Sequence, residues 1–185
     1  ATIDPNTGIV AVPDERLQHL ADLYGPTKII PATVTFVDIA GLVAGASEGE
    51  GLGNKFLANI RQCDAIVHIV RAFHNDDIVH VNDLVDPKSD IEIINTELIL
   101  ADIQTIETRL PKVIKESKAI PASRAAAEYL QSLLTHLNAG TPLSSLPDLN
   151  LEQIADLHLL TAKPVIYAFN VDEKTLVDDS KKAEL

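Results

Sequence analysis

The sequence of 185 residues contains no methionine, no tryptophan and a single cysteine, Cys63. One cysteine excludes a disulfide within the chain, and without a Cys-x-x-Cys pair or a Cys/His cluster the usual zinc ligand sets are excluded too. Its apolar runs are far shorter than the roughly 20 residues that a membrane-spanning helix needs, and the residues from Ala1 onward do not form the pattern of a secretory leader. These absences predict a cytoplasmic protein that does not enter a membrane.

Basic residues are scarce: 15 Lys and Arg stand against 27 Asp and Glu, a formal net charge of −12. This charge disfavours non-specific binding to nucleic acid or to an anionic membrane, so we expect neither DNA nor membrane as a partner. Hydrophobic residues make up 46% of the chain and charged residues 23%, as in ordinary globular proteins. The length and composition therefore predict a folded α/β-sized unit with a core.

Short apolar runs rich in β-formers alternate with amphipathic helical runs. The expected strands cover residues 9–12, 34–37, 65–70 and 165–169, and helices are expected from Pro13 to the Gly25-Pro26 stop and over 54–62. This alternation predicts an α/β fold with a mostly parallel sheet. The uniformly apolar run at 65–70 predicts a buried strand, and the Pro- and Gly-containing residues 2–8 predict a turn.

A long helical insertion separates the last two expected strands. Its apolar residues recur at steps of three or four, in the series Ile99, Ile103, Ile106, Leu110, Val113 and the series Ala126, Leu130, Leu133, Leu137. These heptad seams predict an antiparallel helical hairpin of coiled-coil type, with two ordinary helices packed on the sheet as the alternative. We expect this insertion to span 91–159, with 1–90 and 160–185 forming one domain. Pro111 predicts a kink or an early end in the first helix.

The charge balance inverts within the insertion. Between Arg109 and Arg124 there are five basic residues and one acid, a local net charge of +4. Lys112, Lys115 and Lys118 recur at every third position and predict a basic stripe near the tip of the hairpin. Such a stripe is either an ordinary solvated helix face or a contact for a phosphate backbone.

The run from Val34 to Gly41 has a pattern that is typical of phosphoryl-transfer proteins. An apolar strand ends in Asp38 and is followed, after two small or aliphatic residues, by Gly41. A carboxylate at the end of such a strand can orient the water shell of a Mg²⁺ bound to nucleotide phosphates. Glycine lets a backbone N–H approach the terminal phosphate closely. The alternative is an ordinary strand that happens to end in Asp.

A second polar group follows the expected strand at 165–169. Asn170 and Glu173 stand three positions apart, with Val171 between them. An Asn amide can donate to a purine N7, and a carboxylate can accept from an exocyclic amine. The pattern therefore suits recognition of a nucleotide base, although a capped turn would use the same residue types.

The residues at 38–57, with the glycine-rich run at 44–53, strongly resemble the YchF subfamily of Obg-related P-loop NTPases, the Obg-like ATPases of the TRAFAC class. Residues 2–6, 75–81, 94–98 and 160–164 look like the same subfamily, so the resemblance covers nearly the whole chain. It implies a G-domain-like fold and roles for the matching residues. Thr2 and Asp38 would face Mg²⁺, Gly41 the γ-phosphate, and Asn170, Val171 and Glu173 the base.

Two positions within the resemblance bear on chemistry. Leu42 stands where Ras-like enzymes place a water-positioning glutamine, so the resemblance implies slow hydrolysis or help from backbone, a cation or a partner. Glu173 and Val171 replace the Asp and Lys of the guanine-reading Asn-Lys-x-Asp, which favours adenine, with GTP possible.

The resemblance implies an Mg²⁺-dependent ATPase that couples its nucleotide state to the ribosome. The alternatives are a translation-associated GTPase with relaxed base choice and a non-catalytic protein-interaction module. The 185 residues contain no Gly-x-x-x-x-Gly-Lys-Ser/Thr loop. We expect the sequence to be a piece of a longer protein. This piece lacks the loop and the subfamily's C-terminal ubiquitin-like domain, and we expect it to be inactive alone.

Overall fold

The computed structural model describes residues 6–25, 28–39, 52–75, 85–120 and 122–183. The chain divides into two compact units, residues 1–41 and 42–185, and each is described by itself.

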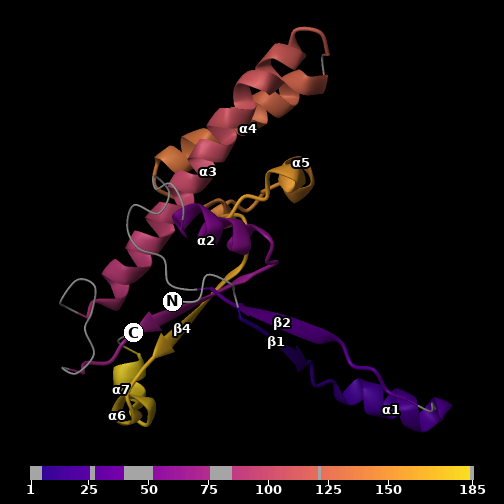
Figure 1. Cartoon of the computed structure of the whole chain (residues 1–185), viewed down its shortest axis with the longest axis vertical. Coiled ribbons are helices and arrows are strands. Elements are labelled where there is room, and N and C mark those ends of the chain that lie inside the picture. Colours follow the sequence, from indigo (N-terminus) through magenta and orange to yellow (C-terminus); the bar gives the residue numbers. More distant parts are fainter. Residues whose placement is uncertain (1–5, 26–27, 40–51, 76–84, 121, 184–185) are drawn as a thin grey trace. The chain divides into compact units, whose positions relative to one another are not determined.

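The first unit is built from a pair of antiparallel strands with a helix in the connection between them. β1 (Asn6–Ala11) pairs with β2 (Thr33–Asp38), so that Asn6 lies opposite Asp38 (Figure 1). The helix α1 (Glu15–Tyr24) begins after Asp14, whose side chain accepts from the Arg16 N–H, and ends at Gly25 in the left-handed conformation that glycine adopts most readily.

The sequence-based boundaries were wrong at the start of this unit. Residues 6–8 were expected in a turn, but they form the first half of β1, because each of them has a register partner in β2. Pro13 was expected at the first helical position and instead precedes the capping Asp14. The two strands and the helix were otherwise located correctly, but this pair of strands is antiparallel, unlike the mostly parallel sheet that the sequence predicted.

The second unit contains a parallel strand pair and most of the helices. β3 (Ile66–Arg71) and β4 (Val165–Asn170) run parallel, with Ile66 opposite Val165 and Arg71 opposite Asn170. Its helices are α2 (Leu52–Arg61), α3 (Pro87–Ser117), α4 (Ala122–Asn138), α5 (Leu151–Ile154), α6 (Glu173–Leu176) and α7 (Asp179–Lys182), with short 3₁₀ turns η1 (Leu143–Ser145) and η2 (Ala155–Leu157).

The side chains of β3 and β4 are more exposed to solvent than their apolar composition predicts. Val70 is buried, but Ile69 is 70% exposed and Ile166 is 61% exposed. Successive side chains of a strand point to opposite faces, so burial alternates along β3 instead of including every residue. The expectation of a fully buried strand at 65–70 was therefore wrong within this chain.

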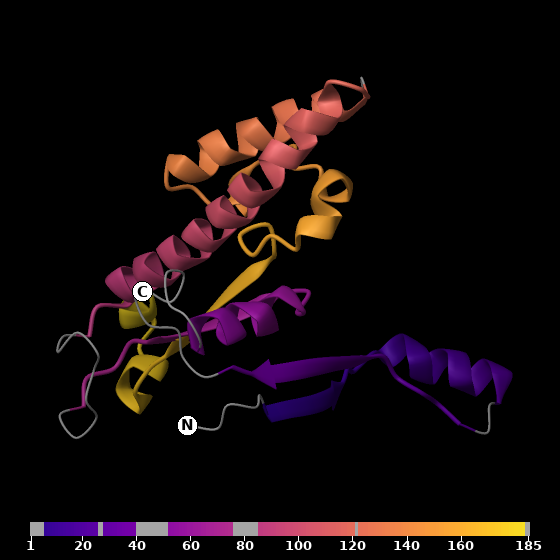
Figure 2. The same ribbon diagram turned by 45° about the horizontal axis from the view of Figure 1, so that its top comes forward.

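The predicted helical hairpin is present: α3 and α4 lie side by side, as Figures 1 and 2 both show. The expected seam residues are in its core. Those that are buried are Ile99, Ile106, Val113, Leu130, Leu133 and Leu137, while Ile103, Leu110 and Ala126 are partly buried against them. Leu143 of η1, Ile154 of α5 and Leu159 complete this core.

Pro111 was expected either to kink the first helix of the hairpin or to end it early, and the early end is wrong. α3 continues from Pro111 to Ser117, and Val113 still packs in the hairpin core. Proline has no N–H to donate to the carbonyl four residues earlier. That carbonyl belongs to the exposed Glu107, where water can take the place of the missing donor.

Within the described part of the chain, no helix combines the length and the apolar composition that crossing a bilayer requires.

Candidate functional site

The carboxyl ends of β3 and β4 bring together polar residues that are about a hundred positions apart in the sequence. Arg71 and Asn170 are register partners, and the Ala72 N–H donates to the Asn170 carbonyl at 2.8 Å. The Asn170 backbone is therefore fixed by the neighbouring strand, while its side chain lies at the exposed end of β4. Carboxyl ends of adjacent parallel strands are the usual position of ligand sites in α/β folds.

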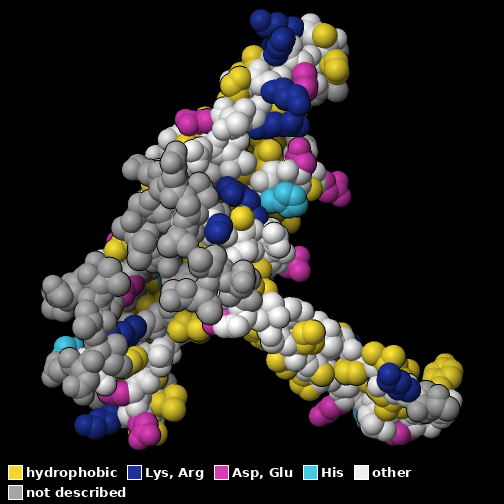
Figure 3. Space-filling model, in the orientation of Figure 1, with side chains coloured by type: hydrophobic (Ala, Val, Ile, Leu, Met, Phe, Trp, Pro, Cys, Tyr) yellow, Lys and Arg dark blue, Asp and Glu magenta, His cyan; other side chains and the backbone are white. Residues whose placement is uncertain are grey.

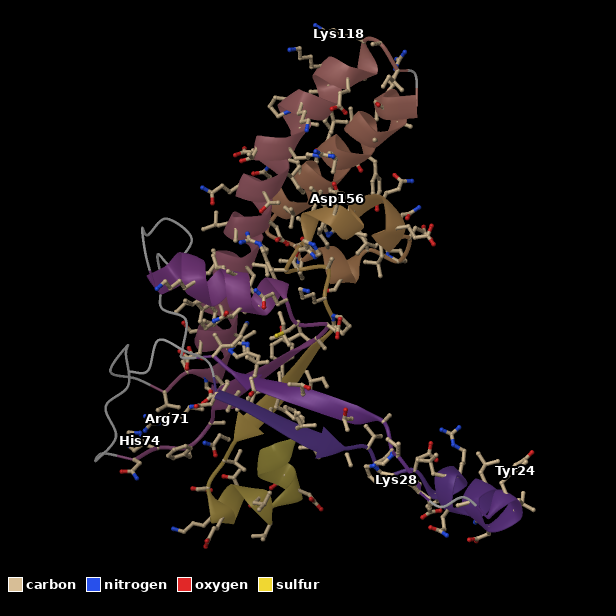
Figure 4. All side chains as sticks on the ribbon, turned by 45° about the vertical axis from the view of Figure 1, so that its right-hand side comes forward. Tyr24, Lys28, Arg71, His74, Lys118 and Asp156 are labelled. Carbon is tan, nitrogen blue, oxygen red and sulfur yellow. The ribbon has the colours of Figure 1, made fainter. Side chains whose placement is uncertain are left out.

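Arg71 organises the chain that follows β3. Its Nε donates to the Phe73 carbonyl at 3.1 Å and its Nη2 to the Asn75 carbonyl at 3.2 Å. The guanidinium also lies over the Phe73 ring, 4.8 Å from the ring centre. Arg71 and His74 are labelled on this segment in Figure 4. Arg71, the register partner of Asn170, thus contacts residues 73 and 75 of the segment that follows β3.

The turn after β4 is closed by a helix cap. Asp172 Oδ1 accepts from the Thr175 N–H at 2.7 Å, so this carboxylate caps α6. Glu173 is the first residue of α6 and is exposed, whereas Val171 is half-buried. Among the described residues, neither the Asn170 amide nor the Glu173 carboxylate has a hydrogen-bonding partner. An amide and a carboxylate at this strand end can bind the polar edge of a purine.

Asp38, the expected magnesium residue, is the last residue of β2 and is exposed. It belongs to the first unit, and Asn170, Val171 and Glu173 belong to the second. The other expected site residues, Thr2, Gly41 and Leu42, lie outside the described residues. The three base-site candidates are neighbours in the sequence and lie at and just after the end of β4, and Asp38 lies at the end of β2.

The basic stripe is at the end of the hairpin that is farthest from β3 and β4. Lys112, Lys115 and Lys118 are all exposed, and Figure 4 labels Lys118 at this end. Dark blue Lys and Arg side chains gather there in Figure 3. None of the three ammonium groups has an ion pair within the part of the chain that is described.

The two arginines of the same region do have carboxylate partners. Arg124 pairs with Glu128 at 3.0 Å, and Arg109 pairs with Asp156 at 3.3 Å. Both pairs are at the surface, where such contacts add little stability. The three lysines are therefore the charges that remain available to a partner.

Sequence reasoning missed one polar group altogether. Asp102 of α3 is completely buried and accepts three hydrogen bonds from Leu160 and Thr161. Burial raises the pKa of its carboxyl, while the hydrogen bonds from Leu160 and Thr161 and the charge of Arg61 lower it in part. The signal in the sequence was an acid next to the apolar heptad positions, between Ala101 and Ile103.

A sequence profile of the family described as "50S ribosome-binding GTPase" matches residues 1–101, more than half of the chain. The chain belongs to this family. Within the family it is similar to YchF proteins, which confirms the resemblance drawn from residues 38–57. The match to this family and the similarity to a solved YchF structure together confirm the expected α/β nucleotide-binding fold.

Two curated relatives are both called ribosome-binding ATPase YchF. The protein of Bacillus subtilis (strain 168) is 50% identical over 182 residues, which cover 97% of this chain and 50% of that protein. The protein of Escherichia coli O157:H7 is 49% identical over 176 residues, which cover 93% of this chain and 48% of that protein. The chain spans about half the length of the curated relatives that it matches.

A solved structure, the YchF GTPase of Schizosaccharomyces pombe, matches the whole chain. The TM-score is 0.77 at 38% identity, and the match covers 100% of this chain and 52% of that chain. The relatives thus carry different nucleotide names, ATPase in the bacterial proteins and GTPase in the yeast protein.

Proposed function

We propose that the full-length protein binds and hydrolyses a purine nucleotide with Mg²⁺, prefers ATP, and couples this reaction to binding of the ribosome. The observation that carries the proposal is the pair of polar side chains at and just after the end of β4, Asn170 and Glu173, which have no hydrogen-bonding partner among the described residues, in a chain of a nucleotide-binding family. Residues 1–90 and 160–185 belong to the nucleotide-binding domain, and 91–159 form its insertion.

The chemistry of the base-site residues fits adenine better than guanine. Guanine presents N–H donors at N1 and N2, which a short aspartate accepts as a pair in Asn-Lys-x-Asp proteins. Glu173 is one methylene longer, and Val171 provides an aliphatic side chain where those proteins have lysine. Asn170 can donate to N7 of either purine, while Glu173 can accept from the exocyclic amine of adenine.

The magnesium residues we propose are Asp38 and Thr2. An exposed carboxylate at the end of β2 is a hard oxygen donor of the kind that Mg²⁺ prefers, directly or through water. The ion would neutralise charge on the β- and γ-phosphates as the γ-phosphoryl group is transferred. Gly41 would donate its N–H to the terminal phosphate, and Leu42 cannot orient a water molecule, so we expect slow hydrolysis in the absence of a partner.

The ribosome contact that we propose is the stripe of Lys112, Lys115 and Lys118. These exposed ammonium groups, which form no ion pair with the residues that the structure describes, lie at the end of a two-helix hairpin, where they can reach phosphates of ribosomal RNA. The chain as a whole carries a net charge of −12, so the contact would be confined to this end. Binding to the ribosome implies a cytoplasmic protein.

The test is a fluorescence titration of the full-length protein with mant-ATP and mant-GTP, with and without Mg²⁺. We expect tighter binding of mant-ATP, with a dependence on Mg²⁺ that Asp38→Asn reduces. Clear preference for mant-GTP would refute the base-reading argument and support the translation-associated GTPase. Absence of binding to either nucleotide would refute the enzyme and leave the non-catalytic interaction module.

A further inference from the structure

Asp102 is a carboxylate in the middle of α3 with no exposed surface. Its Oδ1 accepts from the Leu160 N–H at 2.8 Å, and its Oδ2 accepts from the Thr161 N–H at 2.8 Å and from the Thr161 hydroxyl at 2.7 Å. The donors lie 58 and 59 positions further along the chain. Both carboxylate oxygens are thus satisfied by one short segment outside the helix.

The segment that Asp102 binds leads directly into β4. Thr161 lies four positions before Val165, the first residue of this strand. The Pro164 carbonyl accepts from the Ile66 N–H at 2.9 Å, which fixes the segment to the start of β3. Asn170 is the last residue of the same strand, so the position of the segment determines the position of the base site.

Thr161 also connects this segment to the end of the hairpin core opposite the Lys112–Lys118 tip. Its Oγ1 accepts from the Leu143 N–H at 3.3 Å, and its carbonyl accepts from the Ser144 N–H at 2.9 Å. Leu143 and Ser144 form η1, which follows α4. One threonine therefore contacts α3, the turn after α4 and the entry to β4.

A second set of contacts connects the same region to α2. The Arg61 Nη2 donates to the Thr105 hydroxyl at 3.3 Å, and Thr105 is three residues after Asp102 in α3. The Lys163 ammonium donates to the carbonyls of Arg61, at 3.2 Å, and of Cys63. The last turn of α2 is thus capped by a cation from the segment that precedes β4.

A buried carboxylate is a poor choice for stability alone. Its desolvation is costly, and a well-packed apolar residue in its place is often neutral or stabilising. Apolar contacts can slide, however, whereas hydrogen bonds to two backbone N–H groups and one hydroxyl define a single relative position. Asp102 therefore holds α3 and residues 160–161 in one arrangement, so that they move together.

We propose that Asp102 and Thr161 are positioning residues that couple the helical hairpin to the base-reading end of β4. Binding of a partner at Lys112–Lys118 would displace α3. The hydrogen bonds between Asp102 and Thr161 would transmit this displacement to β4 and so change the affinity for nucleotide. By linkage, bound nucleotide would change the affinity of the tip for its partner by the same factor. This inference rests on the proposed function, because it requires both a nucleotide and a ribosome site.

The test measures the affinity of the full-length protein for Mg²⁺ and mant-ATP, alone and with saturating purified ribosomes. In the wild type we expect the two dissociation constants to differ by about fivefold or more, the usual size of such coupling. Thr161→Val removes the hydroxyl and should bring this ratio close to one. The affinity for mant-ATP without ribosomes, and the affinity for ribosomes without nucleotide, should each change less than about twofold. Thr161→Ser keeps the hydroxyl and should retain the wild-type ratio.

The outcomes separate this inference from the proposed function. A wild type that binds no nucleotide or no ribosome refutes the proposed function itself. If the wild type binds both, the inference is overturned when the nucleotide dissociation constants with and without ribosomes are equal in the wild type. It is also overturned when their ratio is unchanged in Thr161→Val, or when the ratio falls to one in Thr161→Ser as well as in Thr161→Val. The last result would mean that residue 161 acts through packing alone.

A measurement on the unmodified protein covers the case in which Thr161→Val does not fold. Hydrogen exchange is followed with and without mant-ATP, and we expect added protection at 158–164 and at 98–106, on both sides of the Asp102 contact. Protection that is confined to the segment around Asn170–Glu173, with no change at 98–106, would overturn the coupling.

Discussion

The carbonyl of Asn170 accepts a hydrogen bond from the N–H of Ala72 at 2.8 Å, which joins the last residue of β4 to the residue that follows β3. Arg71, the register partner of Asn170, holds the next residues in place through the carbonyls of Phe73 and Asn75. The candidate base site is therefore supported by a strand and a loop that are remote in sequence, which makes its geometry a property of the tertiary fold.

Nucleotide preference should respond to the two substitutions that restore an Asn-Lys-x-Asp pattern. In the full-length protein, Val171→Lys with Glu173→Asp should shift the ratio of dissociation constants toward GTP by about tenfold or more, which corresponds to roughly 1.4 kcal/mol. The shorter carboxylate can accept from both guanine donors. Titrations with mant-ATP and mant-GTP measure the ratio, and Val171→Leu, which remains aliphatic, is the control. An unchanged ratio would contradict the assignment of Glu173 to the base.

Ribosome binding should lose part of its salt dependence when the basic stripe is neutralised. Changing Lys112, Lys115 and Lys118 to Gln should weaken binding and reduce the slope of log Kd against log salt by roughly two, since each lost phosphate contact accounts for about 0.7 to 0.9. Sedimentation with purified ribosomes at several salt concentrations measures both effects. The matched control changes three other exposed lysines, Lys28, Lys55 and Lys88, to Gln. Equal losses in both triple variants would show that only net charge matters.

The Asp102 carboxyl should make stability depend on pH in a particular direction. Burial raises its pKa above 3.8, so between that value and the native pKa the folded state holds a proton that the unfolded state has released. This contribution to stability is full below about pH 3.8 and is lost as pH rises through the native pKa. The unfolding free energy of the wild type minus that of Asp102→Asn should therefore fall as pH rises from about 4 toward 7, because only the wild type loses this contribution.

Urea unfolding of the full-length protein at a series of pH values measures that difference, and each unit by which the native pKa exceeds the ordinary value contributes about 1.4 kcal/mol. Asp148→Asn removes an exposed aspartate and controls for the loss of one negative charge. A difference that grows with pH would mean that the hydrogen bonds from Leu160 and Thr161 outweigh burial.

The hairpin should tolerate the removal of its internal proline. Pro111→Ala restores an N–H that can donate to the Glu107 carbonyl and removes the steric conflict of the ring, so we expect an increase in stability of up to about 3 kcal/mol. Thermal and urea unfolding measure it, with Gln104→Ala, an exposed position of the same helix, as the control. A loss of stability would indicate that the packing of α3 on α4 requires a local distortion at Pro111.

Local patterns in the sequence were sufficient to locate the strands and the longer helices. The three- and four-residue spacing from Ile99 to Val113 and from Ala126 to Leu137 predicted two helices, each with its apolar positions on one stripe. It left open whether they form a hairpin or pack separately on the sheet. Those stripes form the core of the hairpin. The strands of the parallel pair were found for a similar reason, because long β-rich apolar runs bounded by polar residues have few alternatives.

The sequence by itself determined the family, the apolar stripes of the two long helices and the residue types at the end of each strand, because these depend on neighbours within a few positions. Only the tertiary structure showed that residues 6–8 are paired with β2, that β3 is covered unevenly, and that Asp102 binds Thr161. Each of these depends on a partner that is far away in the chain. An isolated acid in a helix has the same local pattern whether water or a remote backbone N–H solvates it, and folding alone selects between the two.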